Sequence, residues 1–156
     1  MKTKDIEKSI YSTFADIATA IGYSEIHGRV IGALLVSNKK LSLNGLAKKT
    51  GYSLSTVSLS LDLLEFLGMI KKTKKAGDRK LYIELHGNLL EGLKKAFLMR
   101  IQKSIDNTLT KFGEYKGELE KINDGEEQKN VMKALNILEE EVKSVNKYVG
   151  LLHKLK

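Results

Sequence analysis

The spacing of apolar residues divides the chain into short amphipathic segments up to residue 87 and long heptad-like segments after it. Residues 4–21 place apolar side chains three and four positions apart, which predicts a helix. Gly22 ends it, and a second helix is predicted over 25–37 with Ser24 as its cap. The stripe of the first helix consists of Ile6, Ile10, Phe14, Ile17 and Ile21.

Residues 42–67 predict two helices joined by a tight turn. Ser42 is suited to cap a helix that runs to Thr50, and Gly51 suits the left-handed position that ends it. A further helix is predicted over 53–67, with Ser53 as its cap. Two helices in this order across a glycine turn are typical of a helix-turn-helix.

A basic β-hairpin is predicted to follow, with strands at 69–74 and 80–85 and a turn that contains Gly77. Leu41 is expected to start a further short strand. A helix-turn-helix followed by a hairpin is a winged helix, in which one helix enters the DNA major groove and the hairpin, the wing (residues 70–84), contacts the backbone or minor groove. The predicted fold is mostly α with a small β-hairpin wing.

The helix over 53–67 has the composition of a recognition helix. Val57, Leu61 and Leu64 form its buried stripe and leave small hydroxyl residues outward, which are able to contact phosphates or base edges. The alternative is a solvent-exposed helix face with no binding role. A surface helix selected for stability, however, would carry Glu, Lys and Ala on that face. The candidate DNA contacts on this helix are Ser53, Ser55, Thr56, Ser58, Leu59 and Ser60.

The wing carries most of the local positive charge. Residues 69–80 contain six Lys or Arg and one Asp, within a chain of net charge +8. The alternative is a solvated surface, but the position after a helix-turn-helix favours contact with phosphates. Arg79 is suited to a narrow minor groove, and Asp78 is expected to orient it. The candidate contacts are Lys74, Lys75, Arg79 and Lys80.

Residues 88–156 predict long helices for dimerisation, separate from a DNA-binding domain over 1–87. Apolar residues alternate by four and three over 101–122, and after a break at 123–125 the alternation resumes without a miss over 131–152, as in coiled coils. The spacing leaves open whether these helices pair within one chain or between chains. The candidate dimerisation residues are Val131, Leu135, Leu138, Val142, Val145, Val149 and Leu152.

Composition excludes several classes of protein. Cysteine is absent, so disulfides and thiolate metal sites are excluded, and the three histidines are too scattered for a metal or nucleophile motif. We therefore expect no enzyme, no metal and no cofactor. Without an apolar run of membrane length or the apolar core of a signal peptide, a cytoplasmic protein with no membrane partner is expected. A small-molecule effector stays open.

The helix-turn-helix and wing resemble those of the MarR superfamily, most closely its GbsR-like branch. The resemblance is carried by Leu43, Leu46-Ala47, Gly51-Tyr52-Ser53, Val57 to Leu61, Leu64 to Lys71, Gly77 to Lys80, and Tyr82. It implies a winged helix flanked by N- and C-terminal helices through which the protein dimerises. The long heptad C-terminus departs from the compact members of the superfamily.

These observations together predict a homodimeric transcriptional regulator that binds double-stranded DNA. Its two recognition helices are expected to enter successive major grooves, about 34 Å apart, on a pseudo-palindromic site. The alternative is a winged helix that binds protein, with a coiled coil that recruits a partner. Salt-sensitive DNA binding discriminates between the two hypotheses.

Overall fold

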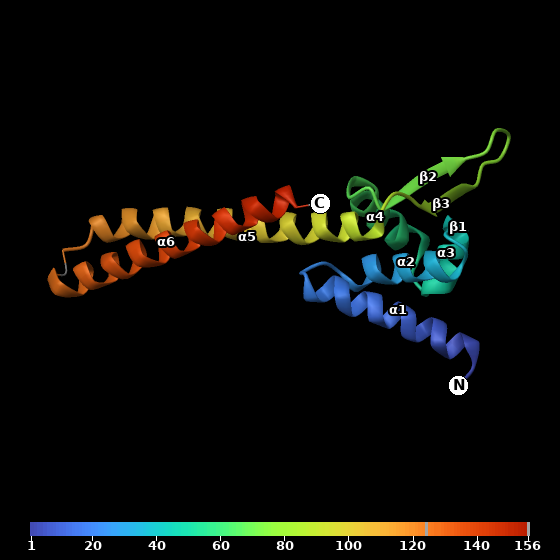
Figure 1. Cartoon of the computed structure of the whole chain (residues 1–156), viewed down its shortest axis with the longest axis horizontal. Coiled ribbons are helices and arrows are strands. Elements are labelled where there is room, and N and C mark those ends of the chain that lie inside the picture. Colours follow the sequence, from blue (N-terminus) through green and yellow to red (C-terminus); the bar gives the residue numbers. More distant parts are fainter. Residues whose placement is uncertain (124, 156) are drawn as a thin grey trace. The chain divides into compact units, whose positions relative to one another are not determined.

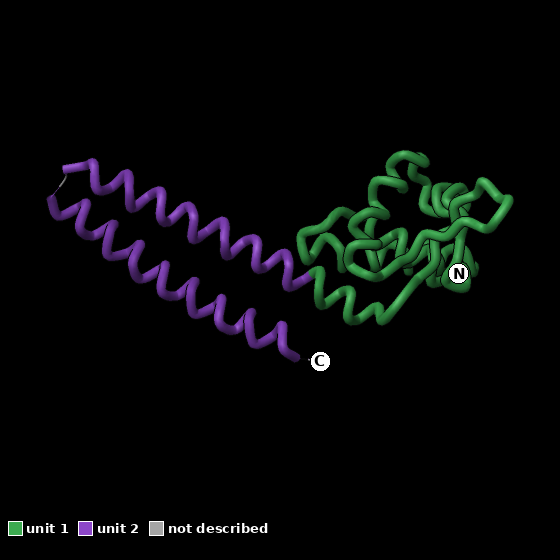
Figure 2. The backbone as a smooth tube through the Cα atoms, turned by 90° about the horizontal axis from the view of Figure 1, so that it is seen from above, with its two compact units in different colours: residues 1–96 green, residues 97–156 purple. Residues whose placement is uncertain are grey.

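The computed structural model describes residues 1–123 and 125–155, and the chain divides into two compact units. The first unit is Met1–Ala96 and the second is Phe97–Lys156 (Figure 2). By its packing, the first unit therefore includes the beginning of the helix that the sequence assigned to the dimerisation region. No helix of the described ranges is long and apolar enough to cross a membrane.

The first unit is a winged helix, which confirms the predicted fold class (Figure 1). Its strands form an antiparallel sheet in the order β1-β3-β2. Ile83 of the central strand β3 pairs with Leu41 of β1 on one edge and with Lys72 of β2 on the other. The elements are α1 (Thr3–Ala20), α2 (Glu25–Val36), β1 (Lys40–Ser42), α3 (Leu43–Thr50), α4 (Leu54–Phe66), β2 (Ile70–Lys74) and β3 (Leu81–Leu85), followed by the start of α5 (Leu89–Glu120).

Helices α1 and α2 cross at very close range. A Cβ atom added to Gly28 would lie 2.0 Å from the Phe14 carbonyl oxygen, so the two backbones touch there. The apolar stripe of α1 is therefore only partly buried, because small residues are needed where the helices cross. The buried residues of α1 are Tyr11, Ala15 and Ala18, whereas Ile6 and Ile17 are exposed.

The predicted helix caps that frame the turn between α3 and α4 are confirmed. The Ser42 hydroxyl accepts a hydrogen bond from the Gly45 N–H at 3.0 Å, and the Ser53 hydroxyl accepts one from the Thr56 N–H at 3.2 Å. Gly51 has φ +80°, the left-handed conformation that glycine adopts without strain. Ser24 occupies the capping position of α2, but its side chain makes no capping hydrogen bond.

The second unit is an antiparallel helical hairpin of residues 97–120 of α5 and α6 (Gly125–Lys154) (Figure 2). Leu98, Ile105 and Val149 form its buried cluster. The Gln102 side-chain amide donates to the Asn146 side-chain oxygen at 3.0 Å, so the hairpin is also held by a polar bridge. The break that the sequence predicted at 123–125 includes residue 124, which lies outside the described residues.

Candidate nucleic-acid interface

Helix α4 is held by one fully buried face and presents a polar face to solvent. Val57 and Leu61 have no exposed surface and Leu64 is 3% exposed, so packing fixes the rotation of the helix about its axis. The outward side carries small hydroxyls around a largely exposed Leu59. Small side chains on the outward side are confined to the first turns, because the exposed Asp62 and Phe66 continue the same face toward the end of the helix. The first turns of α4 are therefore the part that suits entry into a groove. The exposed predicted contacts are Ser53, Ser55, Thr56, Ser58 and Leu59.

Ser60 was expected to face outward, and this prediction is wrong. Its side chain is buried, and its hydroxyl donates a 2.6 Å hydrogen bond to the Val57 carbonyl. The bond satisfies the hydroxyl locally, as serine commonly does inside helices. The sequence carried the signal, because Val57, Ser60, Leu61 and Leu64 follow the spacing of a single helix face.

Two of the exposed hydroxyls on α4 also serve the helix itself. The Ser53 and Thr56 hydroxyls are hydrogen-bonded to each other at 2.7 Å, while Ser53 caps the helix. Substitution of either residue would therefore perturb the cap as well as the surface. The Ser55 hydroxyl is also hydrogen-bonded to that of Ser53, at 3.3 Å. Ser58 and Leu59 are exposed, so these two positions report on the surface with the least effect on folding.

The wing ends in a tight turn that displays Arg79. The Asp78 N–H donates to the Lys75 carbonyl at 3.0 Å, and Gly77 has φ +81°, as in a type II turn. The Asp78 carboxylate accepts a hydrogen bond from the Lys80 N–H at 2.9 Å. Asp78 thus fixes the backbone of the turn, where the sequence had suggested that it orients the Arg79 guanidinium. Arg79 itself is exposed.

The cations of the wing fall into a paired group and an unpaired group. Lys72 lies 3.0 Å from Asp62 and 3.7 Å from Glu65, both on α4, and Lys71 lies 3.8 Å from Glu84 on β3. The hydrogen bond to Asp62 raises the pKa of Lys72 and ties β2 to α4. Within residues 1–123 and 125–155, the four predicted contacts Lys74, Lys75, Arg79 and Lys80 are exposed and make no ion pair.

A surface hollow of about 700 Å³ connects α3, the start of α4 and Lys80, the wing residue that directly precedes β3. Lys48 and Lys80 line it together with Leu54, so two cations and the beginning of α4 share one concave surface. Lys48 was not among the DNA contacts predicted from the sequence. The signal that could have identified it is the Lys48-Lys49 pair in the last turn of α3. Lys49 instead lies 3.8 Å from Glu7.

The heptad seam of α6 is divided between two faces of the helix. Its alternate members pack within the chain, because Leu135 is 8% exposed, Val149 is 3% exposed and Val142 packs against the buried cluster of the hairpin. The other members are each 41 to 49% exposed. We call these the open seam, which consists of Val131, Leu138, Val145 and Leu152.

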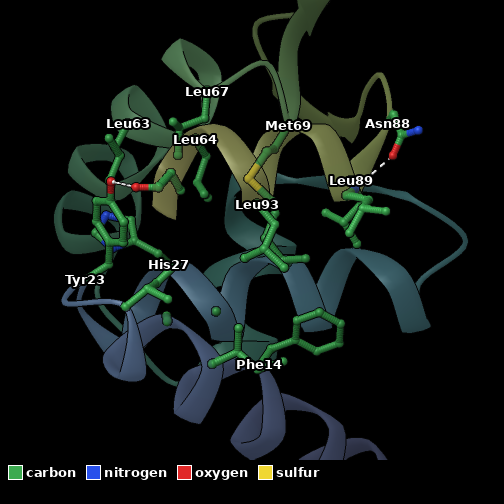
Figure 3. A pocket seen from close by; sticks show the side chains of 17 residues that line it. Phe14, Tyr23, His27, Leu63, Leu64, Leu67, Met69, Asn88, Leu89 and Leu93 are labelled. Carbon is green, nitrogen blue, oxygen red and sulfur yellow. Dashed lines mark hydrogen bonds between the residues drawn. The ribbon is translucent and has the colours of Figure 1, made fainter. Parts of the chain in front are cut away.

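An apolar cavity of about 430 Å³ lies behind α4 in the first unit (Figure 3). Leu63, Leu64 and Leu67 from the end of α4 line it, together with residues of α1, α2 and the start of α5. None of its lining residues is Lys, Arg, Asp or Glu. Tyr23 donates a 2.7 Å hydrogen bond to the Ala96 carbonyl beside it.

His27 is the lining residue able to change its charge near neutral pH. Burial lowers the pKa of His27 and so favours its neutral ring. Its Nδ1 atom is buried and has no hydrogen-bond partner among the described residues. No group of three or more potential metal ligands occurs in the described part of the chain.

No protein-family model matches the sequence, and no curated protein sequence matches it significantly. Solved structures do match. One described as a transcriptional regulator has a TM-score of 0.57 and 17% sequence identity, and the alignment covers 96% of this chain and 99% of that one. At this identity the similarity shows a shared fold over nearly the whole of both chains.

Two further structures are more distant. An S. aureus MepR variant bound to an oligodeoxyribonucleotide is 22% identical with a TM-score of 0.44, over 90% of this chain and 92% of that one. AbsC, a MarR family transcriptional regulator from Streptomyces coelicolor, is 15% identical with a TM-score of 0.43, over 90% and 88% of the two chains.

Proposed function

We propose that this protein is a cytoplasmic, DNA-binding transcriptional regulator of the MarR superfamily, within its GbsR-like branch. It binds a pseudo-palindromic duplex site as a homodimer. The observation that carries the proposal is the small, exposed side chains on the first turns of α4 beside four wing cations that no carboxylate of the described residues neutralises. The role is one of binding, and no catalytic step is part of it.

In this proposal, α4 is the recognition helix. Ser55, Ser58 and Leu59 contact base edges, and Leu59 is suited to the methyl group of thymine. Because this face has no Arg, Asn or Gln, bidentate contacts to bases are not available to it, and part of the sequence preference arises from DNA shape. Arg79 at the tip of the wing reads that shape in a narrow minor groove.

The wing and the hollow that Lys80 lines serve as the phosphate-binding surface in this proposal. Lys74, Lys75 and Lys80 are exposed and have no acidic partner in the described part of the chain, so phosphates bind them without breaking an ion pair seen there. Lys48 joins this set because it shares a concave surface with Lys80. Phosphate contacts set the position of the protein on DNA and leave base selection to α4.

In this proposal, the open seam of α6 is the dimerisation surface. The sequence assigned seven residues to this role, and the three that pack against α5 within the chain are no longer needed for it. Four half-exposed aliphatic side chains in a regular heptad row are costly to leave in water, at about 25 cal/mol for each Å² of apolar surface. Their burial against a second chain removes this cost.

Binding of the full chain to labelled duplex DNA over a range of salt concentrations tests the proposal. A regulator of this kind loses affinity steeply as salt rises, because phosphate contacts release counterions. A protein-binding winged helix, the alternative function, would bind DNA weakly at all salt concentrations. Absence of measurable affinity at low salt would therefore reject the proposal in favour of the alternative.

The cavity behind α4 supports an effector site as a second element of the proposed function. Its lining has no charged side chain, so it favours an uncharged, mainly apolar ligand and disfavours carboxylates. The buried Nδ1 of His27 is available for one hydrogen bond. A ligand here contacts Leu63, Leu64 and Leu67 and so acts on the end of the recognition helix.

N-phenyl-1-naphthylamine, a neutral fluorescent probe, tests the cavity directly. Wild-type protein should enhance its fluorescence, and Ala18→Leu, which places a larger side chain in the cavity, should reduce that enhancement. The matched control is Ala20→Leu, since Ala20 is exposed on the same helix. Equal enhancement by the two variants would show that the probe binds elsewhere.

A further inference from the structure

The three-stranded sheet of the winged helix has one face turned away from the core. Ile83 in the central strand β3 has no exposed surface and faces the core. Because side chains alternate along a strand, its neighbours Tyr82 and Glu84 lie on the opposite face, which we call the outer face. By the register of the strands, the outer face also carries Lys40, Ser42, Lys71 and Thr73.

The ring of Tyr82 holds two ammonium groups on the outer face. The Nζ atom of Lys40, on β1, lies 5.5 Å from the ring centroid, and the Nζ atom of Lys75, directly after β2, lies 5.7 Å from it. Both distances are within the range of about 6 Å over which an aromatic face attracts a cation. The strands on both sides of β3 therefore each direct one cation to the same ring.

These two cations have no counter-charge in the described part of the chain. Lys40 and Lys75 are exposed, and neither makes an ion pair within residues 1–123 and 125–155. The carboxylate of the outer face, Glu84, lies 3.8 Å from Lys71 instead. From their distances to the ring, the two ammonium groups are at most about 11 Å apart. Their mutual repulsion is relieved when anions bind beside them.

We propose that Lys40 is a further contact to the DNA backbone and that Tyr82 is a positioning residue, which holds Lys40 and Lys75 toward neighbouring phosphates of one strand. The inference rests on the DNA binding of the proposed function and adds β1 to its phosphate-binding surface. Adjacent phosphates of a strand are separated by about 3.4 Å along the helix axis, so two cations at this spacing reach neighbouring phosphates.

The aromatic ring suits this role because it holds an ammonium group without neutralising it. The ring attracts the cation through its electron-rich face and leaves N–H donors of the ammonium group for phosphate oxygens. A lysine that is already held also loses less rotamer freedom when it binds a phosphate. Removal of the ring should therefore weaken the contacts of Lys40 and Lys75 while both charges stay on the chain.

Salt-dependent binding of the full chain to one labelled duplex tests the contact of Lys40. Lys40→Gln should reduce the slope of log affinity against log salt by about 0.9, so that the advantage of wild type shrinks about 3.5-fold between 50 and 200 mM salt. The control for net charge is Lys8→Gln, which removes an exposed cation of α1 and should keep the full slope.

The outcomes separate this inference from the proposed function. A full slope for Lys40→Gln, in an experiment in which wild type binds, would overturn the contact of Lys40 and leave the proposed function intact. No affinity of wild type at low salt would reject the proposed function and this inference with it. Lys40 is exposed, so its substitution tests the contact without removing a buried side chain.

A double-mutant cycle tests the positioning role of Tyr82. Tyr82→Val removes the ring but keeps a residue that suits a strand, and Tyr82→Phe keeps the ring. Tyr82→Val should lower affinity, Tyr82→Phe should bind as wild type does, and Lys40→Gln should cost less affinity beside Tyr82→Val than alone. Equal costs of Lys40→Gln in the two backgrounds would overturn the positioning role, as would a loss of affinity in Tyr82→Phe equal to that in Tyr82→Val.

Discussion

The division of the wing cations into paired and unpaired groups yields a quantitative prediction. Lys74, the last residue of β2, and Lys75, which follows it, make no ion pair within the described residues, whereas Lys71 and Lys72 of the same strand are paired with carboxylates. Lys74→Gln with Lys75→Gln removes two positive charges, and so does Lys71→Gln with Lys72→Gln. We expect only the first double variant to lose phosphate contacts.

The magnitude follows from counterion release. Each phosphate contact contributes about 0.9 to the slope of log affinity against log salt, so loss of two contacts reduces the slope by about 1.8. Between 50 and 200 mM salt, the advantage of wild type over Lys74→Gln with Lys75→Gln should therefore shrink by about 12-fold. The variant of the paired lysines should keep nearly the full slope.

Fluorescence anisotropy with one labelled duplex at several salt concentrations measures both slopes. Thermal unfolding of each variant is the folding control, and we expect losses of about 1 kcal/mol or less, because these ion pairs lie at the surface. Equal slope changes in the two double variants would refute the reasoning, because they would show that net charge alone, rather than the unpaired lysines, determines binding.

Three further predictions follow from the described contacts. Ser55→Ala with Ser58→Ala should reduce discrimination between a selected site and scrambled DNA in competition binding, with non-specific affinity nearly unchanged; full discrimination would place the base contacts elsewhere. Leu138→Asp with Val145→Asp should give monomers in sedimentation, because charges enter the interface, and an unchanged dimer mass would contradict the open seam. Gly51→Ala should destabilise the fold by about 1 kcal/mol in thermal unfolding, because alanine is strained at a φ of +80°; an unchanged Tm would contradict the left-handed conformation at this position.

Local sequence signals were sufficient to predict the winged helix. The serine caps and Gly51 act within a few residues of their own positions, so Ser42 and Ser53 identified the starts of α3 and α4 without tertiary information. The same holds for the turn of the wing at Gly77. The crossing of α1 and α2 was missed because it depends on Gly28, whose role appears only when Phe14 lies against it.

The candidate site was predictable as a region but only in part as a set of residues. The sequence identified the helix and the wing, yet it did not show which lysines are neutralised, because Lys72 meets Asp62 and Glu65 only when β2 lies beside α4. The division of the α6 seam also depends on tertiary packing. The heptad pattern gives equal weight to Leu135 and Leu138, and only the position of α5 separates the buried residue from the exposed one.

The central claim is that the chain reads a two-fold symmetric DNA site, and selection from a pool of random duplexes tests it most directly. The full chain is incubated with the pool at moderate salt, and the retained duplexes are amplified and sequenced over several rounds. We predict enrichment of an inverted repeat whose half-sites lie one helical turn, about 34 Å, or a multiple of it apart. Retention of DNA without an enriched sequence, or no retention at all, would contradict the account.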